Sequence, residues 1–394
     1  MNYKKTKYAC FIGYIVQAIV NNFIPLLFLT FQSTYGIPIV KITFLATFNF
    51  GIQLLIDFIS PRFVDKWGYR MSMILANIFS AAGLIGLAVL PNICKDAFSG
   101  LLVSVVIYAI GGGLLEVIIS PIVEACPNDN KEAAMSLLHS FYCWGHVGVV
   151  LISTIFFMTF GTKNWGILSI IWSVIPITNV FFFLKVPIPS VLDDVKNSLS
   201  VKELLGNKLF WIMALFMACA GASDQSIIQW ASVLAEEGLG VDKSIGDLMG
   251  PMMFAGLMGI SRATYGKVGN KISMEKVLIG NGIVCILCYL IMGICKIPII
   301  SLLSCGICGF SVGVFWPGTI SMSAAKIKRG GTAMFAYLAL AGDLGCSLGP
   351  TVVGRVSGIA GGELKKGILV STIFPLILCI GVILSQMRRG SVAK

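Results

Sequence analysis

Long apolar runs recur along the whole chain, and they constrain its fold more than any other feature of the sequence. A helix needs about 20 apolar residues to cross the hydrocarbon core of a bilayer. Because backbone groups in lipid must be hydrogen-bonded within their own segment, we interpret these runs as helices rather than strands. The sequence predicts twelve spans, at residues 8–32, 39–62, 71–91, 98–124, 133–160, 165–186, 208–235, 246–266, 274–294, 297–324, 331–355 and 366–387.

Composition and charge support an all-α protein of the cell membrane. Of the 394 residues, 57% are hydrophobic and only 12% are charged, whereas a soluble domain carries roughly 25% charged residues. Most of the 29 lysines and arginines fall in segments that lie inside the cell if both termini are cytoplasmic, which is the charge bias that orients membrane helices. We expect lipid, protons and a small solute as partners, and a monomer with neither cofactor nor nucleic acid.

The second half of the chain repeats features of the first. The segment Asp65-Lys66-x-Gly68-x-Arg70 follows the second span, and Gly266-Lys267-x-Gly269-x-Lys271 follows the eighth, about 200 positions later. A repeat of half the chain length is typical of two pseudo-symmetric helical bundles. We predict six-helix bundles at 1–186 and 208–394, joined by a polar cytoplasmic linker at 187–207.

Several ionisable side chains interrupt the apolar spans. An ionisable group in hydrocarbon is costly, so such residues usually face an internal cavity and handle protons, ions or substrate. Each could instead be a hydrogen-bonded structural group, and for the histidine this is the commoner case. The residues that we predict to take part in proton coupling are Glu116, Asp224, Asp57 and His139.

Amide, aromatic and further polar residues lie at the same depth. Asn49, Gln53 and Asp57 are four residues apart and share one face of a helix. Amide groups beside an indole suit a sugar, whose hydroxyls need donors and acceptors and whose C–H face stacks on the ring. The same residues could simply join helices. The candidate solute contacts are Gln17, Asn21, Asn22, Gln53, Tyr142, His146, Gln225, Gln229, Trp230 and Asp343.

The motif after the second span resembles that of the major facilitator superfamily, and the later copy resembles its second-half counterpart. Within that superfamily the chain is similar to the fucose-proton symporter group. The stretches that carry this similarity are Leu115-Glu116-x-x-x-x-Pro121, Ser136-Leu-Leu-His139-Ser-Phe141-Tyr142-x-x-Gly145 and Gly221-x-x-Asp224-x-x-x-x-x-Trp230. The resemblance implies the major facilitator fold and proton-coupled uptake of a sugar or polyol by alternating access.

The resemblance also assigns roles to particular positions. Glu116 matches the fourth-helix acid that is linked to the proton in that group. The group's sugar symporter has a further aspartate after an Asn-Asn pair in the first helix, whereas here Phe23 follows Asn21 and Asn22. Fucose itself is therefore not implied. The residues expected near the cytoplasmic face, where charge pairing between helices would control gating, are Asp65, Arg70, Arg262 and Lys267.

Other functions are less well supported. The runner-up is a proton-linked exporter of amphipathic compounds, but the fifth span lacks the proline of the exporters' Gly-x-x-x-Gly-Pro pattern. An enzyme is not expected, because neither a phosphate-binding loop nor a nucleophile–base arrangement is evident. Two Cys-x-x-Cys pairs, which begin at Cys285 and Cys305, have the spacing of a zinc ribbon. Both lie within apolar spans, so we interpret them as packing residues rather than a metal site.

Overall fold

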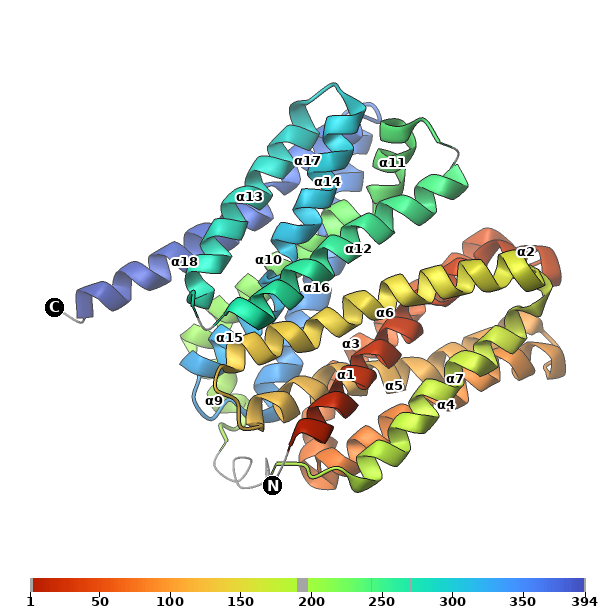
Figure 1. Ribbon diagram of the computed structural model, residues 1–394, viewed down its shortest axis with the longest axis horizontal. Coiled ribbons are helices and arrows are strands. Elements are labelled where there is room, and N and C mark those ends of the chain that lie inside the picture. Colours follow the sequence, from red (N-terminus) through yellow and green to blue (C-terminus); the bar gives the residue numbers. More distant parts are fainter. Residues whose placement is uncertain (1–2, 190–197, 242, 270, 393–394) are drawn as a thin grey trace. The chain divides into compact units, whose positions relative to one another are not determined.

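The computed structural model describes residues 3–189, 198–241, 243–269 and 271–392. Within these ranges the chain forms helices and connecting segments, without strands (Figure 1). Residues 190–197, which belong to the linker predicted at 187–207, lie outside the described residues.

The described residues form twelve helical rods that follow one another in sequence, as the apolar runs predict. A rod that is interrupted along its length carries more than one label. The first six rods are α1 (Lys4–Asn22) with η1 (Ile24–Leu27) and α2 (Phe28–Tyr35), α3 (Ile39–Trp67), α4 (Tyr69–Ile93), α5 (Ala97–Ala125), α6 (Lys131–Phe160), and η2 (Thr162–Asn164) with α7 (Trp165–Lys185).

A short helix, α9 (Val201–Gly206), precedes the second set. It begins with a capping box, in which the Ser200 hydroxyl and the Glu203 carboxylate each accept from the other's backbone N–H. The remaining rods are α10 (Lys208–Ile228) with α11 (Ala231–Leu239), α12 (Lys243–Val268), α13 (Met274–Ile294), α14 (Pro298–Val312) with α15 (Phe315–Lys326), α16 (Gly331–Ile359), and α17 (Leu364–Ser371) with α18 (Ile373–Val392).

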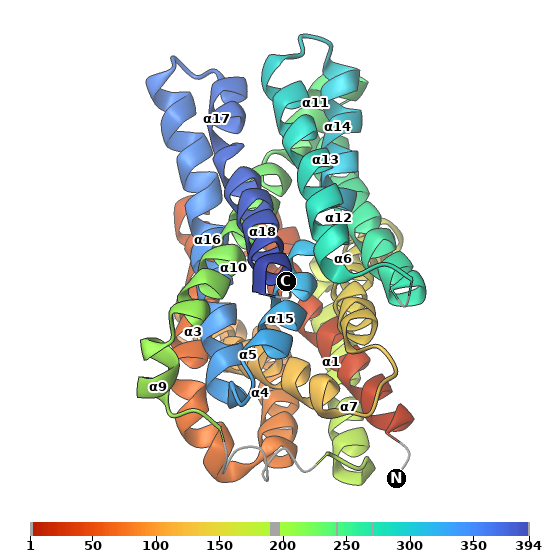
Figure 2. The same ribbon diagram turned by 90° about the vertical axis from the view of Figure 1, so that its left-hand side faces the viewer.

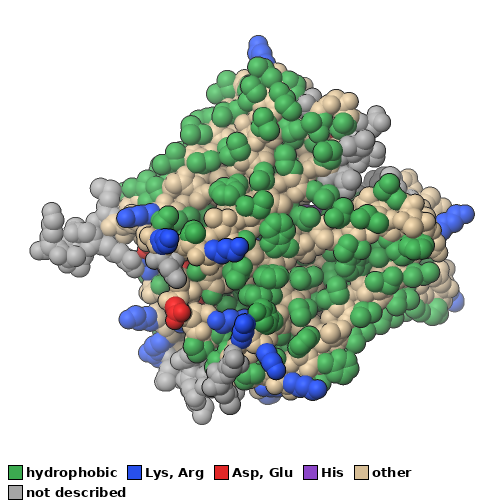
Figure 3. Space-filling view, in the orientation of Figure 1, with side chains coloured by type: hydrophobic (Ala, Val, Ile, Leu, Met, Phe, Trp, Pro, Cys, Tyr) green, Lys and Arg blue, Asp and Glu red, His purple; other side chains and the backbone are tan. Residues whose placement is uncertain are grey.

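The rods have the length and surface of membrane-spanning helices. Among the described residues, ten helical segments are long and apolar enough to cross a bilayer, and α3 and α12, with 29 and 26 residues, complete the twelve. Hydrophobic side chains are spread over the face drawn in Figure 3, and most of the lysines and arginines lie in its lower left part. Such a surface suits contact with acyl chains.

The chain divides into two compact units. Unit 1 comprises residues 1–127, 141–198 and 331–336, and unit 2 comprises 128–140, 199–330 and 337–394. The beginnings of α6 and α16 therefore belong to a different unit from the rest of the same helix. In unit 1, α4 and α7 lie side by side (Figure 1), and in unit 2, α13 and α14 do so (Figure 2). The bundle limits predicted at 186 and 208 stay a prediction.

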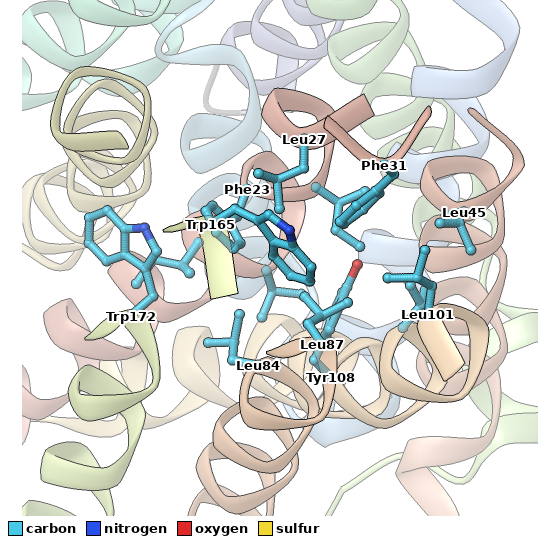
Figure 4. Packing of buried hydrophobic residues seen from close by; sticks show 14 of the residues in the cluster. Phe23, Leu27, Phe31, Leu45, Leu84, Leu87, Leu101, Tyr108, Trp165 and Trp172 are labelled. Atoms are coloured by element: carbon cyan, nitrogen blue, oxygen red, sulfur yellow. The ribbon is translucent and has the colours of Figure 1, made fainter. Parts of the chain in front are cut away.

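An aromatic core fixes the first rod in unit 1 (Figure 4). Phe23, Leu27 and Phe31 are each at most 1% exposed, and they pack with Tyr108 of α5 and Trp165 of α7. The Phe31 and Trp165 ring centroids are 5.0 Å apart at an interplanar angle of 81°, a favoured edge-to-face arrangement. This core holds the first rod in place at the end of α1.

A run of three glycines lets α5 approach its neighbours closely. A Cβ at Gly111 would lie 2.6 Å from a backbone oxygen of α4, that of Ala76. A Cβ at Gly113 would lie 2.9 Å from Ile56 of α3, and one at Gly112 would lie 3.3 Å from Gln53. Small residues at such contacts allow helix backbones to approach within a bilayer, so this run positions α3 beside the following turn of α5.

In unit 2, small residues bring α10 and α16 together. A Cβ at Gly221 would lie 2.2 Å from the carbonyl oxygen of Gly342, and one at Gly345 would lie 2.0 Å from that of Ala218. These approaches are too short for any side chain, so only glycine fits. The two helices that carry Asp224 and Asp343 are thereby packed backbone to backbone.

Candidate functional site

Glu116 belongs to a polar cluster in unit 1, the amide cluster, whose other members are Gln17, Asn21, Asn49, Gln53 and Tyr142. It is half-buried on α5, one turn after Gly112. Its Oε2 accepts a hydrogen bond from Nε2 of Gln17 on α1, over 2.7 Å. The side chain of Gln17 is only 3% exposed. A predicted proton-coupling residue and a predicted solute contact are thus joined directly.

Asn21 of α1 links two further helices of the same cluster, α3 and α6. Its carbonyl oxygen accepts from Nε2 of Gln53 at 2.7 Å and from Nδ2 of Asn49 at 3.1 Å, both on α3. Its own Nδ2 lies 3.5 Å from the Tyr142 hydroxyl on α6, which accepts from it. The i, i+4 spacing of Asn49 and Gln53 places both amides on the face toward α1. The structure therefore unites polar residues from α1, α3 and α6.

The cluster has more acceptors than donors. The amide nitrogens of Gln17, Asn49 and Gln53 donate within it, but the carbonyl oxygen of each is buried without a hydrogen-bond partner among the described residues. All three side chains are at most 3% exposed. A buried acceptor without a donor costs about 1–3 kcal/mol. This arrangement favours a ligand that presents hydrogen-bond donors or positive charge.

Other predicted residues of unit 1 lie around the cluster. Asp57, fully buried, follows Gln53 by one turn on α3, and His146, half-buried, follows Tyr142 by one turn on α6. Asn22 instead donates from Nδ2 to the carbonyl of Ala18 within its own helix, over 2.9 Å.

The predicted polar residues of unit 2 lie where its first rod is interrupted. Asp224 and Gln225 are near the end of α10, and Gln229 and Trp230 form the break before α11. Nε2 of Gln229 donates to Oε1 of Gln225 over 3.2 Å. Oδ1 of Asp224 and Nε1 of Trp230 are buried, and neither has a hydrogen-bond partner within the part of the chain that the structure describes. A carboxylate oxygen and an indole N–H are thus available to a ligand.

Asp343 lies half-buried on α16, next to an aromatic ring that the sequence did not single out. A Cβ at Gly342 would lie 2.4 Å from the Trp316 indole of α15, so this ring covers the backbone adjoining Asp343. Trp316 gives no signal in the sequence beyond its residue type. Trp316 therefore packs against the segment of α16 that carries Asp343.

Arg262 joins helices within unit 2. Only 5% exposed, it donates from Nε to the carbonyl of Gly313, 2.6 Å away, and from Nη1 to that of His139, 3.1 Å away. Gly313 caps the end of α14, where the helix dipole attracts positive charge. The Arg262 charge also acts on Asp224. His139 is 4% exposed on α6, and its backbone is fixed by this contact.

Arg70 and Asp65, the motif residues of unit 1, also lie at helix ends, where the partial charge of the helix dipole is opposite to their own charge. Arg70 donates to the carbonyls of Phe183, Leu184 and Val186 at the end of α7, over 2.6–3.2 Å, where a cation is favoured. Asp65 accepts from the Thr332 hydroxyl in the first turn of α16, over 2.5 Å. Lys267 is exposed on α12.

Thr332 is a second residue that sequence reasoning missed. Its hydroxyl also lies 2.6 Å from that of Tyr69. Burial raises the pKa of the Asp65 carboxyl from its ordinary 3.8, and the hydrogen bond from Thr332 limits that rise. Asp65 lies beyond the span predicted at 39–62, near the end of α3.

Comparisons with known proteins identify the class. The family model for the Major Facilitator Superfamily matches residues 10–350. The chain is similar in structure to the E. coli fucose:proton symporter, with a TM-score of 0.80 at 16% identity over 98% of this chain and 99% of that one. For the proton:xylose symporter XylE bound to 6-bromo-6-deoxy-D-glucose, the TM-score is 0.81 at 11% identity, covering 95% and 94%.

The human organic anion transporter MFSD10 is also similar, with a TM-score of 0.75 at 13% identity over 97% of this chain and 100% of that one. No curated protein sequence matches the chain significantly. At these identities the likeness to solved structures shows the fold alone.

The fold defines the class of the protein, which is that of helical membrane carriers. The chain belongs to the Major Facilitator Superfamily, because the family model spans most of its length. The predicted fold class is confirmed: the chain is an all-α, multi-pass membrane protein with the major facilitator fold, and its described residues form twelve helical rods. Members of this family are transporters.

Proposed function

We propose that this protein takes up a sugar or another neutral, hydroxyl-rich solute together with protons, by alternating access across the cell membrane. Both termini would be cytoplasmic and the working unit a monomer. The observation that carries the proposal is the hydrogen bond from Gln17 to Glu116 inside the amide cluster of unit 1. Glu116 would carry the proton.

Gln17 suits a carboxyl group that must exist in both charge states. Its Nε2 donates to the Glu116 carboxylate, and its Oε1 is buried without a donor among the described residues. A protonated carboxyl gains an O–H donor, and an amide offers both a donor and an acceptor. Reorientation of one side chain can therefore satisfy Glu116 before and after protonation. Without such a partner, a buried carboxyl would have an unsatisfied hydrogen-bonding group in at least one of its two protonation states, at a cost in free energy.

The solute class follows from the ligand-facing atoms. Sugar hydroxyls would donate to the carbonyl oxygens of Gln17, Asn49 and Gln53, whose N–H groups are already engaged. In unit 2, Asp224 would accept a hydrogen bond from a hydroxyl, and Trp230 would donate from its indole N–H to a solute oxygen while its ring contacts a C–H face. An anionic solute is disfavoured by this excess of oxygen acceptors. Two structurally similar proteins are described as proton symporters of fucose and xylose.

The other predicted residues take secondary roles in this proposal. Asp57 would extend proton transfer from Glu116 in unit 1, and His139 would extend it from Asp224 in unit 2. Further solute contacts would come from Asn21, Asn22, Tyr142, His146, Gln225, Gln229 and Asp343. Asp65, Arg70, Arg262 and Lys267 would stabilise one of the alternating states through their contacts at helix ends.

The test is solute-dependent proton movement in proteoliposomes. Addition of the correct solute outside unenergised vesicles should make the external medium more alkaline, because protons enter with it. Sugars, polyols and nucleosides are compared with amphipathic cations, which an exporter would favour. External alkalinisation with a hydroxyl-rich solute supports the proposal. Proton release driven by an amphipathic cation, with no response to hydroxyl-rich solutes, would refute it.

A further inference from the structure

We propose that the amide cluster of unit 1 also binds an alkali cation, which competes with the proton at Glu116. This inference goes beyond the proposed function but rests on it for the role of Glu116, and the cation would occupy the three carbonyl oxygens when no solute hydroxyl does. It starts from the buried carbonyl oxygens of Gln17, Asn49 and Gln53, for which the described residues provide no donor. Their side chains are 3%, 2% and 1% exposed.

The three oxygens belong to one connected group rather than to scattered sites. Asn49 and Gln53 both donate to the same oxygen of Asn21. Oε1 of Gln53 would lie 3.4 Å from a Cβ at Gly112, one turn before Glu116 on α5. Gln17 contacts Glu116 itself. The amide nitrogen beside each of the three oxygens is therefore anchored, to Asn21 for Asn49 and Gln53 and to Glu116 for Gln17.

The backbone at the end of α1 adds to this excess of acceptors. Pro25 supplies no N–H, so the carbonyl of Asn21, four residues earlier, loses the donor that an unbroken α-helix would provide. The last turn of α1 contains no basic residue, and the negative end of a helix dipole favours a cation. Interrupted helices of this kind hold coupling ions in other membrane carriers.

The ligand set selects the chemical class of the ion. Amide and carboxylate oxygens are hard ligands, which suit alkali and alkaline-earth ions rather than transition metals. A single carboxylate, Glu116, accompanies neutral carbonyls in this set, whereas calcium sites typically use several carboxylates. The sequence places no lysine or arginine between Lys7 and Lys41, between Lys41 and Arg62, or in α5. A monovalent cation is therefore the best match in charge.

Thermal unfolding of the purified full-length protein tests this directly and needs no solute. Sodium, potassium and lithium chloride are each compared with choline chloride at equal ionic strength. Binding to the folded state should raise Tm saturably, on the order of 2–5 °C, for at least one alkali cation. The rise should be smaller at acid pH, where the proton occupies Glu116. An equal response to choline, or a response confined to magnesium or calcium, would overturn the inference.

A matched pair of variants links the effect to the cluster. Asn49→Ala removes one of the three oxygens and should abolish the cation-dependent rise in Tm. Asn77→Ala removes another fully buried asparagine of unit 1, which is bonded to Met73 and Asn179 on α4 and α7, and should preserve it. A rise that survives in Asn49→Ala would also contradict the inference. Absence of the rise together with intact solute-dependent proton uptake would refute the cation site while leaving the proposed function standing.

Discussion

Gln17 of α1 and Glu116 of α5 are joined by a 2.7 Å hydrogen bond from the amide nitrogen to the carboxylate. A hydrogen bond to a charged group is worth about 1.5–3 kcal/mol. We therefore expect Gln17→Leu to reduce proton-driven accumulation of solute by roughly 10- to 100-fold. The measurement is radiolabelled solute uptake under an imposed pH gradient.

Tyr14→Phe provides the control for this variant. The Tyr14 hydroxyl lies 3.0 Å from that of Ser120, between the same two helices, so its loss removes an α1–α5 contact while the hydrogen bond from Gln17 to Glu116 is kept. Accumulation should then change by less than about three-fold, the effect of a single weak hydrogen bond. Equal losses in the two variants would show that Gln17 acts only by holding the helices together.

Substitution of Trp230 tests the solute contact predicted in unit 2. Its buried Nε1 lacks a hydrogen-bond partner in the described chain, so Trp230→Phe keeps a ring but removes a donor. We expect the KM for solute to rise by about 10-fold, which corresponds to 1.4 kcal/mol. Trp211→Phe, which alters an indole that is 58% exposed and bonded to the Leu205 carbonyl, should leave KM unchanged. An unaltered KM in Trp230→Phe would remove this residue from the binding site.

Substitution of Gly345 tests the close packing of α10 and α16. Because an added Cβ would lie 2.0 Å from the Ala218 carbonyl, Gly345→Ala should destabilise the protein by about 1–3 kcal/mol through overpacking. Gly354 lies on the same helix, and a Cβ there meets no atom within 4 Å. Gly354→Ala should therefore leave Tm in detergent nearly unchanged. Similar Tm values for the two variants would contradict the packing described for these helices.

The Thr332–Asp65 contact predicts a pH dependence of stability. Thr332→Val removes the donor that limits the rise in the Asp65 pKa, and it should cost about 1 kcal/mol at neutral pH. A carboxyl whose pKa is raised in the folded state binds its proton more tightly there than when unfolded. Folded-state stability therefore increases as pH falls through the raised pKa, and the gain is complete below the ordinary value of 3.8.

The Tm difference between wild type and Thr332→Val should consequently shrink on acidification. Thr332→Ser retains the hydroxyl that contacts Asp65 and Tyr69, so it should follow the wild type across the pH range. A Tm difference that is constant with pH would exclude Asp65 as its source.

Much of the fold was predictable because bilayer physics leaves few alternatives for apolar runs of this length. Neither the break after α1 nor the break between α10 and α11 was predicted, although Pro25 gives the first a visible cause, whereas the second has no proline. Residue spacing indicated that Asn49 and Gln53 share a face, but not that both donate to Asn21. The partnership of Asp65 with Thr332 joins positions 267 residues apart, and no local pattern encodes such a contact.

The central claim is that Glu116 carries the coupled proton, and Glu116→Gln tests it most directly. In proteoliposomes, this variant should exchange external labelled solute for internal unlabelled solute at a rate near that of the wild type. Under an inward proton gradient it should fail to accumulate solute above the external concentration. Accumulation equal to that of the wild type would contradict the account.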